Sequence, residues 1–192
     1  AVSAIAELAL AEANRVPLFE APGLLSGLVE VLRTRTGFAQ QYAVFAIAHL
    51  ASVDANRVPL FEAPGLLSGL VEVLQNGPSG AQGIAVSTIT QLASVDANKV
   101  PLFEAPGLVT ALVEAGGENA FEIIKKLAEA TEIRAPLFEK LAEVLQNGTA
   151  DAQEHAVSAI AELALAEANR VPLFEAPGLV TALVEVLQNG TA

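Results

Sequence analysis

The sequence predicts an all-α protein, a right-handed α-solenoid of three-helix repeats with a regular period of about 42 residues. The first observation behind this fold class is internal repetition, because the text of Ala13–Leu32 recurs unchanged as Ala55–Leu74. The second is the helical spacing of apolar residues inside each copy. One such unit cannot bury its apolar face alone, so neighbouring copies are expected to stack into a continuous array.

Two of the repeats are shorter than the others. The same asparagine recurs at one regular interval at Asn14, Asn56 and Asn98, and then only after a much longer interval at Asn169. Recurring prolines divide that longer interval into two nearly equal parts: Pro101, Pro136 and Pro172. We therefore predict two shortened repeats, lacking seven and six residues. The chain is predicted as one repeat domain, residues 1–192, divided at 1–13, 14–55, 56–97, 98–132, 133–168 and 169–192.

Each regular repeat is predicted to contain three helices. Pro17 is expected at the first position of a short first helix, where its missing N–H costs nothing, and Pro22-Gly23 is expected to end that helix. Leu24–Leu32 is the second helix, and a Gln-Asn-Gly sequence ends its regular copies at Gln75–Gly77 and Gln188–Gly190. The third helix is the longest, Ala152–Glu167, with a buried stripe at Ala156, Ile160, Leu163 and Ala164.

The repeats are identical over unusually long stretches. Ala1–Gly23 has the same sequence as Ala156–Gly178, which is expected only after a very recent duplication or in a chain that was built. Ala115–Lys140 differs from the regular text and is rich in Glu, Lys, Ala, Leu and Ile, as in idealised helices. We interpret the chain as engineered, with this region reshaped to alter the curvature of the array or to make a pocket.

Composition excludes several classes of function. The chain has 22 Asp and Glu against 10 Lys and Arg, a net charge of −12, which disfavours nucleic acid and anionic membranes as partners. It has no cysteine, hence no disulfide or thiolate nucleophile, and no spacing typical of metal ligands. No apolar stretch reaches the ~18 residues of a membrane span, and no signal-peptide pattern is present. We expect a soluble protein without cofactor, with its location undetermined.

The order of helices resembles the armadillo-repeat family. Each regular repeat has a short helix, a Pro/Gly break, a second helix, an Asn-Gly turn and a long third helix, and the entry Asn14…Gly23 is similar to that family's. HEAT repeats are the near alternative. The resemblance implies an extended peptide held in a concave groove along the third helices by a Trp and, four residues later, an Asn. The Trp column here holds Ser3, Phe45, Ser87, Glu122 and Ser158, and the Asn column holds Glu7, His49, Gln91, Lys126 and Glu162.

Because neither column keeps the family's residue, generic peptide binding is not implied. One repeat instead carries an aromatic patch, since Tyr42, Phe45 and His49 share a face of its third helix. The patch either contacts a ligand or packs against an adjacent helix. Ligands with positive charge or aromatic groups suit an acidic chain with such a patch. The predicted ligand-binding residues are Tyr42, Phe45, His49, Gln91, Lys126 and Glu162.

Other charged residues have ordinary structural interpretations. Arg33 and Arg35 are expected in a turn, where they either bind an anion or remain solvated. Lys125 and Lys126 are candidates for a nucleophile of lowered pKa, but Glu122 and Glu129 stand at the spacing of exposed helix ion pairs. No catalytic residues are predicted. The alternatives to a non-catalytic binding or assembly scaffold are a designed small-molecule pocket or artificial enzyme in 115–140, and a peptide-binding adaptor fragment.

The two ends of the chain are complementary half-repeats. The sequence begins within a third helix and ends after a second helix, and both ends carry apolar residues of the interior type. We expect head-to-tail association with a second copy, giving a dimer or a ring, unless other residues cap the ends. The predicted interface residues are Val2, Ile5, Leu8, Leu179, Leu183 and Leu187.

Overall fold

The computed structural model describes residues 1–189, and within that range every regular element is an α-helix, as the sequence predicts. The chain divides into two compact units, Ala1–Asn98 and Lys99–Ala192, which are described separately. Among the described residues no single helix is long and apolar enough to span a membrane, although α13 and α14 meet the criterion as a pair bent by 86°.

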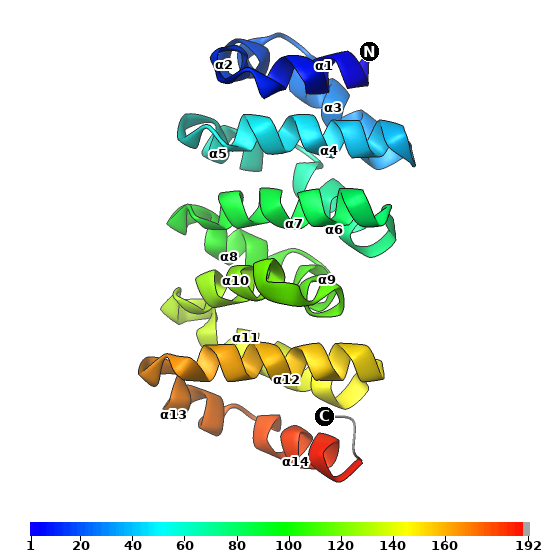
Figure 1. Cartoon of the computed structure of the whole chain (residues 1–192). Helices are drawn as coiled ribbons and strands as arrows, with labels where there is room; N and C mark the ends of the chain where they lie inside the picture. Colours follow the sequence, from blue (N-terminus) through cyan, green and yellow to red (C-terminus); the bar gives the residue numbers. More distant parts are fainter. Residues whose placement is uncertain (190–192) are drawn as a thin grey trace. The chain divides into compact units, whose positions relative to one another are not determined.

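The first unit contains three helices that are each the third helix of a repeat, and we call them third-type helices. The first and second helices of the repeats, which we call first- and second-type helices, lie between them in the sequence. Figure 1 shows α1, α4 and α7 as successive rows, and each packs on the next. The helices of this unit are α1 (Val2–Leu10), α2 (Glu12–Glu20), α3 (Leu24–Thr34), α4 (Phe38–Ala51), α5 (Asp54–Phe61), α6 (Leu66–Asn76), α7 (Ser79–Ala93) and the start of α8 (Asp96–Glu104). Their buried face is almost wholly aliphatic, with residues such as Leu32, Ile47 and Ile89 fully buried.

The second unit contains the two shortened repeats. Its further helices are α9 (Leu108–Ala115), α10 (Gly117–Ala128), α11 (Thr131–Asn147), α12 (Ala150–Leu165), α13 (Glu167–Glu175) and α14 (Leu179–Asn189). The first shortening ends α9 early at Gly116, whose φ of +61° suits glycine. A Cβ there would overlap the ring of His155. The second shortening removes the Pro-Gly break, so that first and second helices fuse into α11 around Pro136.

The predicted positions of several helix ends need correction. The sequence predicts Pro17 at the start of the first helix, but α2 begins at Glu12 and Pro17 lies inside it. The acidic side chain of Glu12 suits the positive end of the helix, and the helix tolerates the lost N–H at Pro17. The third helix α12 runs from Ala150 to Leu165, two residues earlier than predicted. Leu24 does begin α3, after Gly23 with a φ of 77°, and Gly190, expected to end α14, lies outside the described residues.

The recurring asparagine joins the third helix of one repeat to the first helix of the next. In the first unit the Asn56 side-chain amide donates to the carbonyl of Leu50 at 3.1 Å and that of Asn98 to Leu92 at 3.0 Å. In the second unit Asn169 donates to Leu163 at 3.0 Å. The carbonyls at the end of an α-helix lack partners within it. This asparagine supplies one, which explains its regular recurrence.

Candidate binding site between α4 and α7

Three of the six predicted ligand-binding residues line one hollow in the first unit. Phe45 and His49 come from α4 and Gln91 comes from α7, and the hollow between them has a volume of about 590 Å³. The remaining lining consists mainly of small or apolar residues and one arginine: Arg15, Ala48, Ser52, Ser79, Gly80, Gly83, Ile84 and Ser87. None of these lining residues is an Asp or Glu.

The hollow exists because α7 carries small residues on this face. Gly80, Gly83 and Ser87 stand where α4, one regular period earlier in the sequence, carries Phe38, Gln41 and Phe45. A Cβ built on Gly83 meets no atom within 4 Å, so the space beside it is open. A glycine inside a helix destabilises it by about 1 kcal/mol relative to alanine. Gly83 therefore weakens α7, and the absence of a side chain at this position keeps the hollow open.

One wall of the hollow is an aromatic pair. The rings of Phe45 and His49 meet edge to face, with centroids 4.5 Å apart and planes at 74°. Burial lowers the pKa of His49, and the charge of Arg15 lowers it further. Its imidazole is therefore neutral at pH 7, with one N–H to donate and one nitrogen that accepts.

Arg15 is fixed at the edge of the hollow by three hydrogen bonds. Its Nη1 donates to Ser52 Oγ at 2.8 Å, its Nε to the Ala9 carbonyl at 3.2 Å and its Nη2 to the Leu10 carbonyl at 3.2 Å. Ser52 Oγ in turn donates to the His49 carbonyl at 2.7 Å. The last carbonyls of α1 and the hydroxyl of Ser52, just after α4, thus hold this cation of α2 beside His49.

The side chain of Gln91 contains a buried oxygen atom that has no hydrogen-bond partner. Its Oε1 is buried and accepts no hydrogen bond within the described structure. A buried acceptor without a donor costs about 1–3 kcal/mol, and such groups are rare in folded proteins. Because this oxygen is closed to solvent, an N–H or O–H donor of a ligand would reach it only after the Gln91 side chain turned toward the hollow.

The other predicted ligand-binding residues lie elsewhere. Tyr42 is on α4 but outside the lining of the hollow, with 37% of its surface exposed. Lys126 and Glu162 belong to the second unit, on α10 and α12. Lys126 Nζ lies 3.7 Å from a Glu122 carboxylate oxygen, and Glu162 lies 3.7 Å from Lys125 Nζ. The structure therefore brings together half of the predicted set.

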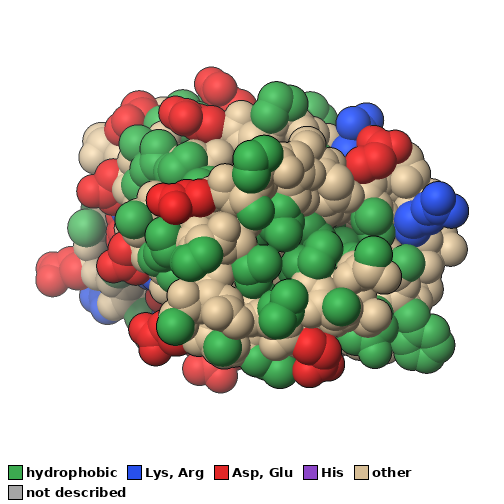
Figure 2. Space-filling model, turned by 90° about the horizontal axis from the view of Figure 1, so that it is seen from above, with side chains coloured by type: hydrophobic (Ala, Val, Ile, Leu, Met, Phe, Trp, Pro, Cys, Tyr) green, Lys and Arg blue, Asp and Glu red, His purple; other side chains and the backbone are tan. Residues whose placement is uncertain are grey.

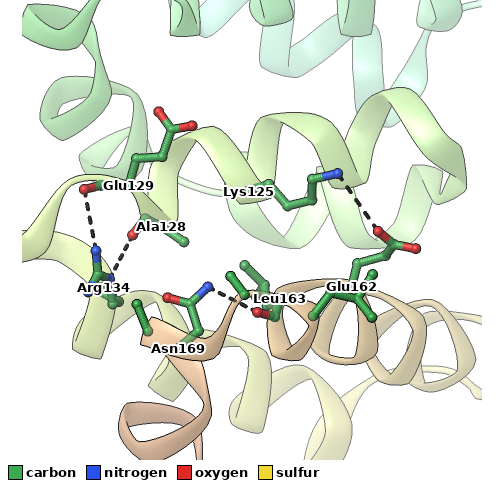
Figure 3. Close-up of a pocket in the computed structure, with 10 residues that line it drawn as sticks. Lys125, Ala128, Glu129, Arg134, Glu162, Leu163 and Asn169 are labelled. Atoms are coloured by element: carbon green, nitrogen blue, oxygen red, sulfur yellow. Dashed lines mark hydrogen bonds and ion pairs between the residues drawn. The ribbon is translucent and has the colours of Figure 1, made fainter.

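A second hollow, of about 360 Å³, lies in the second unit and is drawn in Figure 3. Its polar groups are already paired. Lys125 Nζ approaches Glu162, the Asn169 amide donates to the Leu163 carbonyl, and Arg134 Nε donates to the Ala128 carbonyl at 2.7 Å.

Lys125 does not have the properties of a lysine nucleophile. A hydrogen bond to Glu122, 3.1 Å away, raises the pKa of Lys125 above its ordinary value, and the charges of Glu122 and Glu162 raise it further. A nucleophilic lysine needs the opposite shift. Within residues 1–189 no group of three or more His, Asp or Glu is placed to hold a metal ion.

The predicted interface residues divide between two faces. On α1, Val2 and Ile5 are half-buried and Leu8 is 52% exposed. On α14, Leu183 is half-buried and Leu187 is 73% exposed. Leu179 differs from the others, because it is buried within its own unit at 2% exposure.

Sequence reasoning missed Arg15, Ser52, Gly80 and Gly83. The signal for the glycines was present, since aligning the third helices shows small residues in α7 where α4 has large ones. The role of Arg15 had no signal within one repeat. Its partner Ser52 lies 37 residues away, and the same link recurs between Arg57 and Ser94.

Comparison with known proteins gives a structural likeness but no family. No family model and no curated protein matches the chain. It is similar to the crystal structure of an engineered protein from the Northeast Structural Genomics Consortium, with a TM-score of 0.66 and 26% sequence identity. The match covers 97% of this chain and 82% of that one. The likeness agrees with the all-helical fold of this chain, and membership of the armadillo family stays a prediction.

Proposed function

We propose that this chain is an engineered helical-repeat scaffold without catalytic activity, and that it binds an extended peptide in the hollow between α4 and α7. The observation that carries the proposal is the open space at Gly83, in a hollow that the aromatic pair Phe45 and His49 and the amide of Gln91 also line. The exact internal repeats and the similarity to an engineered protein support the designed origin.

The lining favours a ligand with an apolar or aromatic group and a neighbouring N–H. Phe45 and Ile84 offer apolar contacts, and Gln91 Oε1 would accept an N–H once its side chain turned toward the hollow. An extended peptide supplies both, since its side chains alternate with backbone amides. The net charge of the chain favours cationic ligands, but the site itself holds Arg15 and no carboxylate. We therefore expect binding that does not depend on basic residues in the peptide.

The alternative functions have less support. A lysine-based enzyme in 115–140 conflicts with the raised pKa of Lys125 and with the paired charges around it. An adaptor for basic peptides would need carboxylates in the hollow, and its lining has none.

Fluorescence anisotropy with three labelled peptides tests the proposal. The first has a single Phe in a Gly-Ser framework, the second has Ala in place of that Phe, and the third has Lys flanking the Phe. We expect the first and third to bind equally at low and high salt, and the second to bind at least about tenfold more weakly. Binding that needs the lysines and disappears with salt would contradict this proposal.

Variants of the hollow connect binding to its geometry. Gly83→Phe fills the open space and should abolish binding, whereas Gly83→Ala adds one methyl group and should weaken it less. Gln91→Ala should weaken binding by about tenfold by removing the acceptor. The matched control is Gln75→Ala, at an exposed glutamine of α6 outside the hollow, which should bind normally. Unchanged binding by Gly83→Phe would exclude this site.

A further inference from the structure

A cationic side chain recurs at one position of the repeats, and at Arg15 it has no acidic partner. Arg57 is its equivalent in the next repeat, and Lys99 is the equivalent in the repeat after that. Arg57 Nη2 lies 2.6 Å from an Asp54 carboxylate oxygen, and Lys99 Nζ lies 2.6 Å from one of Glu129. Arg15 donates to two carbonyls and a serine hydroxyl, and among the described residues it makes no ion pair.

The missing acidic partner of Arg15 is not a consequence of where the sequence begins. The carboxylate beside Arg57 comes from its own helix, and the one beside Lys99 comes from the residue after the third helix of the same repeat. Both of these positions exist for Arg15. They are occupied by Glu12, which makes no ion pair with Arg15, and by Ser52, which offers a hydroxyl instead. A further repeat before the first residue would occupy neither position.

The hollow between α4 and α7 differs in charge from the rest of this acidic chain. The chain has 22 Asp and Glu against 10 Lys and Arg, and Figure 2, a view from the end that carries α1, shows many acidic and few cationic side chains. Arg15 nevertheless lines the hollow without any Asp or Glu. Burial and then the charge of Arg15 lower the pKa of His49, the other titratable group of the lining. The lining therefore carries one positive charge at pH 7.

Arg15 keeps hydrogen-bond donors that a ligand can use. Each terminal nitrogen of a guanidinium carries two N–H groups, and Nη1 and Nη2 of Arg15 each use one of them within the protein. The remaining N–H groups are of the kind that holds a carboxylate, because bonds between a guanidinium and a carboxylate are stronger than those between neutral groups. The existing bonds also fix the side chain, so it loses little rotamer freedom when a ligand binds.

We propose that the hollow between α4 and α7 selects a peptide that has a carboxylate next to its aromatic residue, and that Arg15 binds this carboxylate. The proposal rests on the peptide-binding function proposed above, since it concerns the same hollow. Phe45 contacts the aromatic side chain of the peptide, and Arg15 in the same lining contacts its carboxylate. Either the C-terminus of the peptide or an Asp side chain supplies this group.

Fluorescence anisotropy with four labelled peptides tests the selection on the whole chain. Two peptides end in Phe, one with a free carboxylate and one amidated. The other two are amidated and have Asp or Asn directly after the Phe, so each pair differs almost only in one charge. At about 0.15 M salt, charges beyond about 8 Å are largely screened. We expect at least one acidic peptide to bind at least about fivefold more tightly than its neutral partner, and the pair concerned identifies the source of the carboxylate.

Two variants connect this preference to Arg15. Arg15→Gln removes the cation, and Ser52→Glu supplies the carboxylate that Glu129 gives to Lys99. Each variant should bind the acidic and neutral peptides equally, with the affinity of the parent chain for the neutral one. Arg57→Gln is the matched control and should keep the preference, because Arg57 makes the same bond to a serine but does not line the hollow. Circular dichroism confirms that each variant is folded.

The pKa of His49, followed by NMR, shows where the carboxylate lies. A carboxylate beside Arg15 favours the protonated imidazole, so the pKa of His49 should be higher in the complex with the preferred acidic peptide than with its neutral partner. Equal pKa values in these two complexes would overturn the proposal. Equal affinities within both peptide pairs, or a preference that survives in either folded variant, would also overturn it and leave the peptide site standing. If none of the four peptides binds, the proposed function itself fails.

Discussion

Leu8 and Leu163 occupy the same place in a repeated sequence but lie in opposite environments. Both are followed by Ala-Leu-Ala-Glu-Ala-Asn-Arg, and both belong to a third-type helix. Leu8 is 52% exposed and Leu163 is 1% exposed. Truncating each to alanine therefore isolates the effect of burial on stability with the local sequence held constant.

The expected difference in unfolding free energy is about 2 kcal/mol, from burial and cavity terms together. Leu163→Ala removes fully buried methyl groups and leaves a cavity, which typically costs about 3 kcal/mol. Leu8→Ala loses about half of the burial term and leaves no enclosed cavity, so about 1 kcal/mol is expected. A difference of about 2 kcal/mol corresponds to roughly a thirtyfold change in the unfolding equilibrium.

Urea unfolding at low protein concentration measures both effects. Circular dichroism follows the helices of both units, and the fluorescence of the single tyrosine, Tyr42, follows the first unit. Leu163→Ala should shift the circular-dichroism transition of the second unit, and Leu8→Ala should shift the fluorescence transition slightly. Equal destabilisation by the two substitutions would refute the assignment of one bare and one covered environment.

Three further predictions concern single groups. His49 should titrate below its ordinary pKa of 6.5 in NMR spectra, and Arg15→Ala should raise that pKa toward 6.5 without reaching it, because burial, the larger cause, remains. Since the folded chain disfavours protonated His49, stability should fall as pH drops from 6.5 through the lowered pKa, and His49→Gln should remove that part of the pH dependence. Gly116→Ala should destabilise the second unit by at least about 1 kcal/mol in urea unfolding, because alanine is strained at a φ of +61° and its Cβ would overlap a ring; an unchanged transition would contradict this. Asn56→Ala should cost about 1–2 kcal/mol, more than Asn14→Ala, because only the Asn56 bond is buried; equal costs would count against the role given to burial.

Much of the fold is predictable because the same sequence pattern recurs in several repeats of the chain. The Pro-Gly breaks and helical spacing place the second helices, and Leu24 begins α3 as predicted. The start of the first helix is not predictable from Pro17 alone, since α2 begins at Glu12, whose acidic side chain suits that end, and holds Pro17 in its interior. The fusion into α11 had a local signal, because the residues after Pro136 lack the Pro-Gly break of the other repeats.

The candidate site is only partly predictable, because the hollow depends on the absence of a side chain at Gly83 as well as on the side chains that line it. Looking for chemically capable side chains finds Phe45, His49 and Gln91, but it does not find the space that Gly83 leaves. Lys126 and Glu162 share the sequence column of His49 and Gln91 and yet lie in the other unit, among their own ion pairs. A column in a repeat alignment gives the face of a helix, and the neighbouring helix decides whether that face lines a hollow.

The hollow between α4 and α7 is the proposed binding site for an extended peptide. The most direct test is an NMR titration of the ¹⁵N-labelled chain with the Phe-centred peptide, following the backbone amide of Gly83 and the side-chain amide of Gln91. We predict saturable shifts of both signals, with residues of α10 and α12 unchanged, and no shifts in the Gly83→Phe variant. Shifts centred on α10 and α12, or shifts that persist in Gly83→Phe, would contradict the claim.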